Sequence, residues 1–144
     1  MHRKGVNYDV GVFPFGRDRP SRVLFDSATV RREMEIIRAQ LHCTSVRIVG
    51  RDLNRLVAAS EHALDAGLEV WFAPVLHDAD EYATMQYLDL CAVDAEKLRQ
   101  RSPNVIFMVG SELSFAMNGL LSGKSSMDRV RTAMQPHRLL LSTI

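Results

Sequence analysis

Short apolar runs alternate along the chain with longer segments in which apolar residues recur at helical spacing. The runs GVNYD, TSVRIV, LEVWFAPVL and VIFMV predict strands over residues 5–9, 44–49, 68–76 and 105–109. The segments between and after them predict helices over about 27–41, 52–66, 79–101 and 125–140. Strands that alternate with helices in this way indicate βαβ units and a parallel sheet.

Acidic and hydroxyl residues stand where the predicted helices begin. Asp26 or Ser27 can cap the first helix, Asp52 the second, and Asp78 or Asp80 the third. A side-chain oxygen at such a position accepts a hydrogen bond from a backbone N–H that has no partner within the helix. We therefore expect these residues to fix the helix starts.

The apolar residues predict which faces of the elements are buried. The first helix has a stripe at Val30, Met34, Ile37 and Leu41, and the third at Tyr82, Met85, Leu88, Ala92, Ala95 and Leu98. Gly67 can adopt the left-handed conformation that ends the second helix. The run at 105–109 is the most apolar, so we expect it to be a strand buried on both faces.

Four βα units in a single α/β domain spanning 1–144 are compatible with two architectures. One is the N-terminal (βα)4 half of a TIM-type barrel, and the other is a small open doubly wound parallel sheet. Both use the same right-handed crossover, so local pattern does not separate them. A closed (β/α)8 barrel needs about 250 residues, and this chain has 144.

Composition excludes several classes of protein. The chain is 47% hydrophobic and 24% charged with a net charge of +1, which gives no reason to expect nucleic acid as a partner. Cys43 and Cys91 lie far apart, so neither a disulfide framework nor a paired-cysteine metal site is expected. The apolar runs are shorter than the roughly 18 residues of a membrane span. The N-terminus lacks the apolar stretch of a signal peptide, so we expect a cytoplasmic protein with no membrane partner.

Each predicted strand ends next to an ionisable group. The residues at or near these ends are Asn7, Tyr8 and Asp9, then Arg47 and Arg51, then His77 and Asp78, then Ser111 and Glu112. In both candidate architectures, ligands bind at the carboxyl ends of parallel strands. These positions are therefore the candidate site.

Glu112 and Arg47 are the two strongest candidates. Glu112 follows an apolar strand, and a partly desolvated carboxyl there would suit a general acid; alternatively, it stabilises the start of the next helix. Arg47 has apolar neighbours on both sides. It would either orient an active-site carboxylate or extend its charged end to the edge of the sheet.

Other motifs are weaker. His77 with Asp78 could contact a polar substrate, but no second histidine stands at metal-ligand spacing, so we expect neither a metal nor a cofactor. The segment 118–125 ends in Gly-Lys-Ser like a phosphate-binding loop, but Asn118 replaces the first glycine. It also does not directly follow a strand, so a phosphate- or nucleotide-binding domain is the least favoured interpretation.

The segments KGVNYD, SVRIVG, LEVWFAPVLHD and NVIFMVGSELS together resemble the first four strands of a glycosidase-type (β/α)8 barrel. More specifically, the chain resembles a bacterial family of glycosidase-like barrels often labelled abortive phage infection proteins. The start G-V-N-Y-D, the segment H-C-x-x-V-R-I and the segment G-x-E-L-S are the most informative, and the resemblance covers residues 4 to about 123.

The resemblance implies roles for individual residues. Glu112 matches the general acid/base on strand four of a retaining glycoside hydrolase, and Arg47 matches an arginine that supports the nucleophile. His77 and Asp78 fall where that clan places polar substrate contacts. Ser111 stands where the clan usually has an asparagine that bonds the sugar 2-hydroxyl.

The resemblance also implies that the site needs more than this chain offers. The nucleophile of the family arises on strand seven, and the best second carboxyls here are Asp78 and Asp9. We therefore expect a half-barrel that is inactive alone, with one apolar sheet face exposed. It would self-associate or bind a missing C-terminal half, and a carbohydrate would be its small-molecule ligand. The alternative is a non-catalytic module that dimerises or binds a partner.

Overall fold

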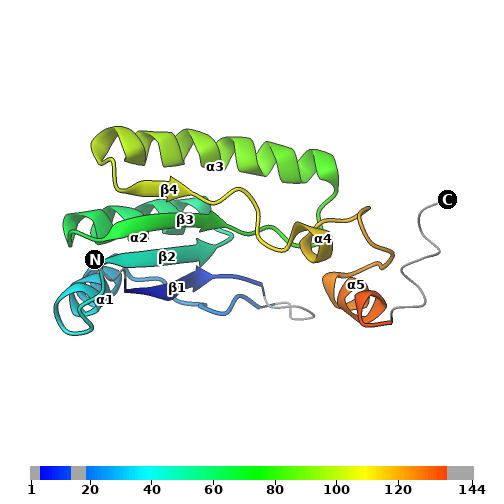
Figure 1. Cartoon of the computed structure of the whole chain (residues 1–144), viewed down its shortest axis with the longest axis horizontal. Helices are drawn as coiled ribbons and strands as arrows, with labels where there is room; N and C mark the ends of the chain where they lie inside the picture. The colour runs from blue at the N-terminus through cyan, green and yellow to red at the C-terminus, as the bar shows by residue number, and fades with distance from the viewer. Residues whose placement is uncertain (1–3, 14–18, 136–144) are drawn as a thin grey trace.

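The computed structural model describes residues 4–13 and 19–135, and within them it contains an alternating series of strands and helices (Figure 1). The elements are β1 (Gly5–Gly11), α1 (Ser27–Ala39), β2 (Ser45–Gly50), α2 (Leu53–Asp65), β3 (Glu69–Pro74), α3 (Glu81–Arg101), β4 (Val105–Phe107), α4 (Leu113–Ala116) and α5 (Ser126–Ala133).

The four strands form one sheet in the order β1-β2-β3-β4, and every neighbouring pair is parallel. This confirms the predicted α/β class and the predicted parallel sheet. A doubly wound sheet built on the order 2-1-3-4 is not what forms. Sequential parallel strands with a helix after each one are consistent with a half-barrel.

One face of the sheet carries the core. Val46 and Ile48 of β2 and Val70 and Phe72 of β3 are fully buried on this face, where α2 and α3 pack. The helices, with α1 packed against α2, contribute a second group of core residues: Val30, Met34, Ile37, Leu56, Ala59, Ala63, Leu88, Cys91, Ala95 and Leu98. Because side chains alternate along a strand, the intervening residues point to the opposite face.

No described helix packs on that opposite face, which we call the open face. Its central row, set by the strand register, is Asn7, Arg47, Trp71 and Ile106. The expectation that the exposed face is apolar is therefore wrong for β1 and β2, where polar side chains occupy it. On these two strands the open face carries the polar side chains of Asn7 and Arg47.

Helix capping follows the sequence closely. The side chains of Asp26, Asp52 and Asp80 accept hydrogen bonds from Thr29, Arg55 and Ala83 at the starts of α1, α2 and α3. Gly67 has a φ of +77°, as expected for the residue that ends α2. Asp78 caps none of these three helices and has a separate role.

Three predictions about elements were wrong in part. β4 covers only Val105–Phe107, and Ile106 is 37% exposed because β4 lies at the edge of the sheet and no described helix covers its open face. In α3, Tyr82 and Met85 are exposed. The helix α4 was not predicted, and the predicted last helix is described only as far as residue 135.

Two further sequence expectations concern the cysteines and the membrane. Cys43 and Cys91 are both buried and unbonded to each other. Burial raises the pKa of the Cys91 thiol to about 11, so it lies far from the reactive thiolate form at neutral pH. Over the described part of the chain, every helix is too short or too polar to cross a membrane.

Candidate functional site

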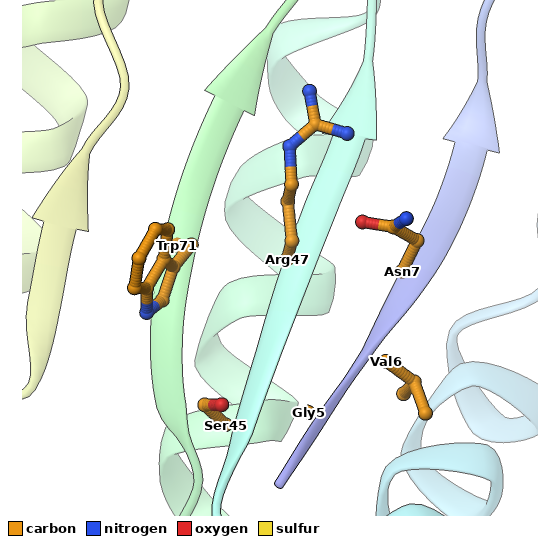
Figure 2. Close-up of a pocket in the computed structure, with 6 residues that line it drawn as sticks. All are labelled: Gly5, Val6, Asn7, Ser45, Arg47 and Trp71. Atoms are coloured by element: carbon orange, nitrogen blue, oxygen red, sulfur yellow. The ribbon is translucent and has the colours of Figure 1, made fainter. Parts of the chain in front are cut away.

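The open face contains a shallow hollow of about 170 Å³ around Arg47. Its lining residues are Gly5, Val6, Asn7, Ser45, Arg47 and Trp71. Figure 2 shows the Arg47 side chain extended toward the carboxyl end of β2, with the Asn7 amide on one side and the Trp71 ring on the other. Arg47 therefore lies on the open face, on the side of the sheet opposite the helices (Figure 2).

Arg47 connects the open face to the loop that follows β4. Its Nη2 donates a hydrogen bond of 3.3 Å to the hydroxyl oxygen of Ser111. The next residue in the chain is Glu112. The fold thus brings Arg47 to Ser111, 64 positions away, and so to the loop that carries Glu112.

Glu112 occupies an unusual backbone position. Its φ and ψ are 53° and 41°, in the left-handed region that residues other than glycine seldom adopt. It directly precedes α4, and its side chain makes no capping bond to that helix. The residue is exposed, so the expected partial desolvation is wrong, because nothing described covers this end of the sheet. Glu112 stands at the N-cap position of α4, where the alternative interpretation placed an acidic residue, although its side chain makes no capping bond.

Trp71 is a member of this face that the sequence interpretation missed. It pairs with Arg47 in the sheet register, and its ring N–H donates to Glu69 Oε1 at 2.9 Å. The ring is partly exposed and offers an apolar surface beside a guanidinium. The signal was present: Trp71 alternates with the buried Val70 and Phe72, which places it on the opposite face.

Asp9 lies on the open face as well, two residues after Asn7. Its Oδ1 accepts hydrogen bonds from the backbone N–H groups of Gly11 and Val12, at 2.7 and 3.1 Å. Gly11 has a φ of +124°, and the register shifts at this point. Asp9 therefore shapes the end of β1, and one of its two carboxylate oxygens is committed to that turn.

Asp78 is directed to a different part of the molecule. Its Oδ1 accepts bonds from the backbone N–H and the hydroxyl of Ser126 and from Nη2 of Arg129, each at 2.5–2.6 Å. Burial alone would raise the pKa of Asp78, but the bonds from Ser126 and Arg129 outweigh it and lower the pKa below its usual value. Asp78 thus anchors the start of α5.

Arg129 completes this anchor and was not singled out by the sequence. It is 0% exposed, and it also donates to the carbonyls of Phe115 and Ala116 and to the amide oxygen of Asn118. No local pattern marks it, since one arginine in a polar helix is unremarkable. The Asp78 carboxylate also occupies the N-terminus of α5, which is where a phosphate-binding loop would hold its phosphate.

His77 lies next to Asp78 but faces the loop after β1. Its Nδ1 is 2.9 Å from the carbonyl oxygen of Phe13. That contact joins the ends of β3 and β1. His77 thus lies near the carboxyl edge of the sheet, as the sequence predicted, and its ring contacts the main chain.

No protein family matches the chain, and no curated protein matches it either. What this face can do must follow from its own residues. Within residues 4–13 and 19–135, no three histidine, cysteine, aspartate or glutamate side chains come together as metal ligands would. The face instead combines a guanidinium, an amide and an indole ring, and the loop after β4 adds the Ser111 hydroxyl and the Glu112 carboxyl beside it.

These groups suit a neutral, polyhydroxylated ligand. The guanidinium and the amide of Asn7 offer several hydrogen-bond donors and one acceptor to hydroxyl groups. The ring of Trp71 offers an apolar surface on which the C–H face of a sugar ring can pack. Glu112 contributes the carboxyl of this set, the group type that acts as a general acid or base.

Proposed function

We propose that this chain supplies the acid/base half of a glycoside-hydrolase-like site. Glu112 would be the general acid, Arg47 and Ser111 would bind the sugar, and Asn7 and Trp71 would line the same site. The observation that carries the proposal is the bond from Arg47 to Ser111, because it brings the open face of β2 next to Glu112. The family resemblance supports the same assignment of Glu112; a link to phage defence rests on that resemblance alone.

The proposal includes catalytic incompleteness. A retaining reaction needs a second carboxylate about 5 to 5.5 Å from the acid, on the opposite side of the scissile bond. Asp9 is bonded to the turn after β1, and Asp78 is bonded to Arg129 and Ser126. Neither is suited to attack an anomeric carbon. The nucleophile would come from a complementary half that covers the open face.

A non-catalytic module that dimerises or binds a partner is the second candidate. The observation in its favour is that β1 and β4 each pair with one described strand only, which leaves two sheet edges. In that case the groups around Arg47 would contact a protein surface, and Glu112 would have no catalytic role.

A small anion can stand in for the missing nucleophile and so test the proposal. We would incubate the chain with a panel of phenyl glycosides in the presence of sodium azide. Azide would form a bond to the anomeric carbon as the bond to the phenol oxygen breaks, and Glu112 would give its proton to that oxygen. The expected products are a glycosyl azide and phenol, detected by mass spectrometry.

Two variants make the result specific. Glu112→Gln should abolish azide-dependent release of phenol, because the proton donor is lost. Glu35→Gln removes an exposed carboxyl on α1 and should leave the release unchanged. Absence of glycosyl azide across the whole panel, or equal release by Glu112→Gln, would contradict the proposal. Turnover without azide would contradict the claim of incompleteness.

A further inference from the structure

A second hollow lies at the carboxyl ends of β1 and β2. It has a volume of about 470 Å³ and is lined by Gly11, Phe13, Pro20, Arg51, Asp52 and Arg55. It shares no lining residue with the hollow around Arg47. We call it the arginine cleft, after the two guanidinium groups in its wall.

Arg51 is held in place by its main chain and by an aromatic ring. Its backbone N–H donates to the carbonyl of Gly11 at 3.0 Å, and its own carbonyl accepts from the Tyr87 hydroxyl at 2.7 Å. The guanidinium carbon lies 5.1 Å from the centre of the Phe13 ring. The guanidinium group of Arg51 forms no ion pair or hydrogen bond with the described residues. A stacked guanidinium leaves its N–H edge free to bind an oxoanion.

Arg55 forms the second cationic wall. Its Nη1 donates to the carbonyls of Val10 and Arg22, and its Nη2 donates to the carbonyl of Val23, at 2.8 to 3.3 Å. These bonds use three of the five N–H groups of the guanidinium and lock its orientation. Gly11 allows this approach, because a Cβ there would lie 3.2 Å from Nη1.

The acidic member of the cleft does not cancel these charges. Asp52 is the N-cap of α2, and its Oδ1 accepts a bond of 3.0 Å from the backbone N–H of Arg55. Its charge therefore faces the orphan N–H groups of the helix. The lining has two guanidiniums against one carboxylate, so it attracts anions.

We propose that the arginine cleft binds a small molecule carrying a carboxylate or phosphate group beside an apolar portion. Arg51 is the direct ligand of the oxoanion. The two N–H groups of Arg55 that make no bond to the described residues also donate to the oxoanion. The rings of Phe13 and Pro20 contact the apolar portion. The site is separate from Glu112, so it does not depend on the proposed glycosidase-like activity.

Calorimetric titration of the whole chain with three probes tests this assignment. The probes are inorganic phosphate, benzoate and phenyl phosphate; benzoate and phenyl phosphate share a phenyl ring, so they distinguish a carboxylate from a phosphate ligand. We expect phenyl phosphate to bind more tightly than inorganic phosphate, because only the former also contacts Phe13 and Pro20. Loss of the charge-assisted bonds in Arg51→Gln should weaken binding of the preferred probe by about tenfold or more.

Arg32→Gln is the matched control, since it removes the same charge from an exposed position on α1. It should leave the affinity within about twofold of the unchanged chain. Glu112→Gln should also leave it unchanged. The assignment is overturned if none of the probes binds with a Kd below about 10 mM, or if Arg51→Gln binds as tightly as the unchanged chain. An equal loss in Arg32→Gln would overturn it too, because general charge would then explain the binding.

Discussion

The side chains of Tyr8, Arg22 and Glu33 form a polar cluster between β1 and α1. The cluster accommodates Tyr8 on the core side of the sheet. The hydroxyl of Tyr8 donates to a carboxylate oxygen of Glu33. Arg22 donates to both, at 2.6 Å to the Tyr8 oxygen and 2.9 Å to Glu33, and also stacks on the Tyr8 ring. Because each polar atom has a partner, Tyr8 can be half-buried without the cost of an unpaired hydroxyl.

The pKa values in this cluster move in opposite directions. Burial, together with the bond to Glu33, raises the pKa of Tyr8 well above its usual value of 10.0. Burial also tends to raise the pKa of Glu33, but the bonds from Tyr8 and Arg22 outweigh it and lower that pKa below 4.5. The stabilisation from Glu33 is therefore fully present above about pH 4.5 and is lost as the pH falls through its folded-state value.

We expect Glu33→Gln to lower the free energy of unfolding by roughly 1 kcal/mol at neutral pH, a figure reduced by solvent screening of a partly exposed pair. The variant should also lose less stability than the unchanged chain when the pH is lowered from about 7 to about 3.5. Urea denaturation at both pH values measures the two effects.

Glu35→Gln is the control for this prediction, because Glu35 is exposed on the same helix. It should change neither the stability nor its pH dependence. The same acid sensitivity in Glu33→Gln and in the unchanged chain would show that the cluster contributes nothing to the acid transition.

At the level of elements, α4 and α5 are positioned by one buried guanidinium. Arg129 donates hydrogen bonds to the carbonyls of Phe115 and Ala116 in α4. Its bond to Asp78 joins α5 to the loop after β3. Backbone bonds from Asp78 to Ala116 and from Asn118 to Ala79 support the same junction. The helices α4 and α5 are therefore attached mainly by polar contacts, whereas α1, α2 and α3 pack through apolar side chains.

Asp78→Asn should release this attachment without unfolding the sheet. The variant leaves Arg129 buried without its counter-ion, and the Asp78 side chain is 47% exposed, so we expect a local cost of about 1–3 kcal/mol. Amide hydrogens of α5 should then exchange at least about tenfold faster, while those of β2 keep their protection. Hydrogen exchange followed by mass spectrometry measures both regions.

Asp89→Asn provides the comparison, since Asp89 is an exposed carboxylate on α3. It should leave exchange in α5 unchanged. Equal acceleration in α5 and β2 after Asp78→Asn would mean that the two regions unfold together, contrary to the separate attachment described above.

At the scale of the whole molecule, the sheet is covered on one side only among the described residues. Its open face is polar at Asn7 of β1 and Arg47 of β2. The edge strand β4 exposes Ile106 at 37% and is followed by Val109 at 65%. Unpaired strand edges with apolar residues favour pairing with another chain. The open face is less apolar than the sequence predicted, so we expect association to proceed through the β4 edge.

Sedimentation of the chain at tens of micromolar should therefore show a dimer or larger species. Ile106→Lys places a charge on the edge strand and should shift the population toward monomer. Leu90→Lys places the same charge on the exposed outer surface of α3, where Leu90 is 62% exposed, and should have no effect. A stable monomer of the unchanged chain at these concentrations would argue for a self-sufficient domain.

Local pattern determined much of the architecture. The period of apolar residues separated strands from helices, and the caps at Asp26, Asp52 and Asp80 fixed three helix starts, because both depend on residues within a few positions of each other. Sequential βα units with one handedness of crossover then left few strand orders to choose between. On α3, Leu88 is buried and Met85 is exposed, because only part of that helix lies against the sheet. The apolar spacing alone predicted Met85 to be buried.

Tertiary structure decided which polar groups meet. Arg47 bonds Ser111 across 64 positions, and Asp78 bonds Arg129 across 51. The sequence placed Asp78 among the substrate contacts because it stands at a strand end, yet its nearest cation comes from a helix after the last strand. A hydrogen bond between distant residues depends on distances that the whole fold sets, and composition and periodicity carry no information about them.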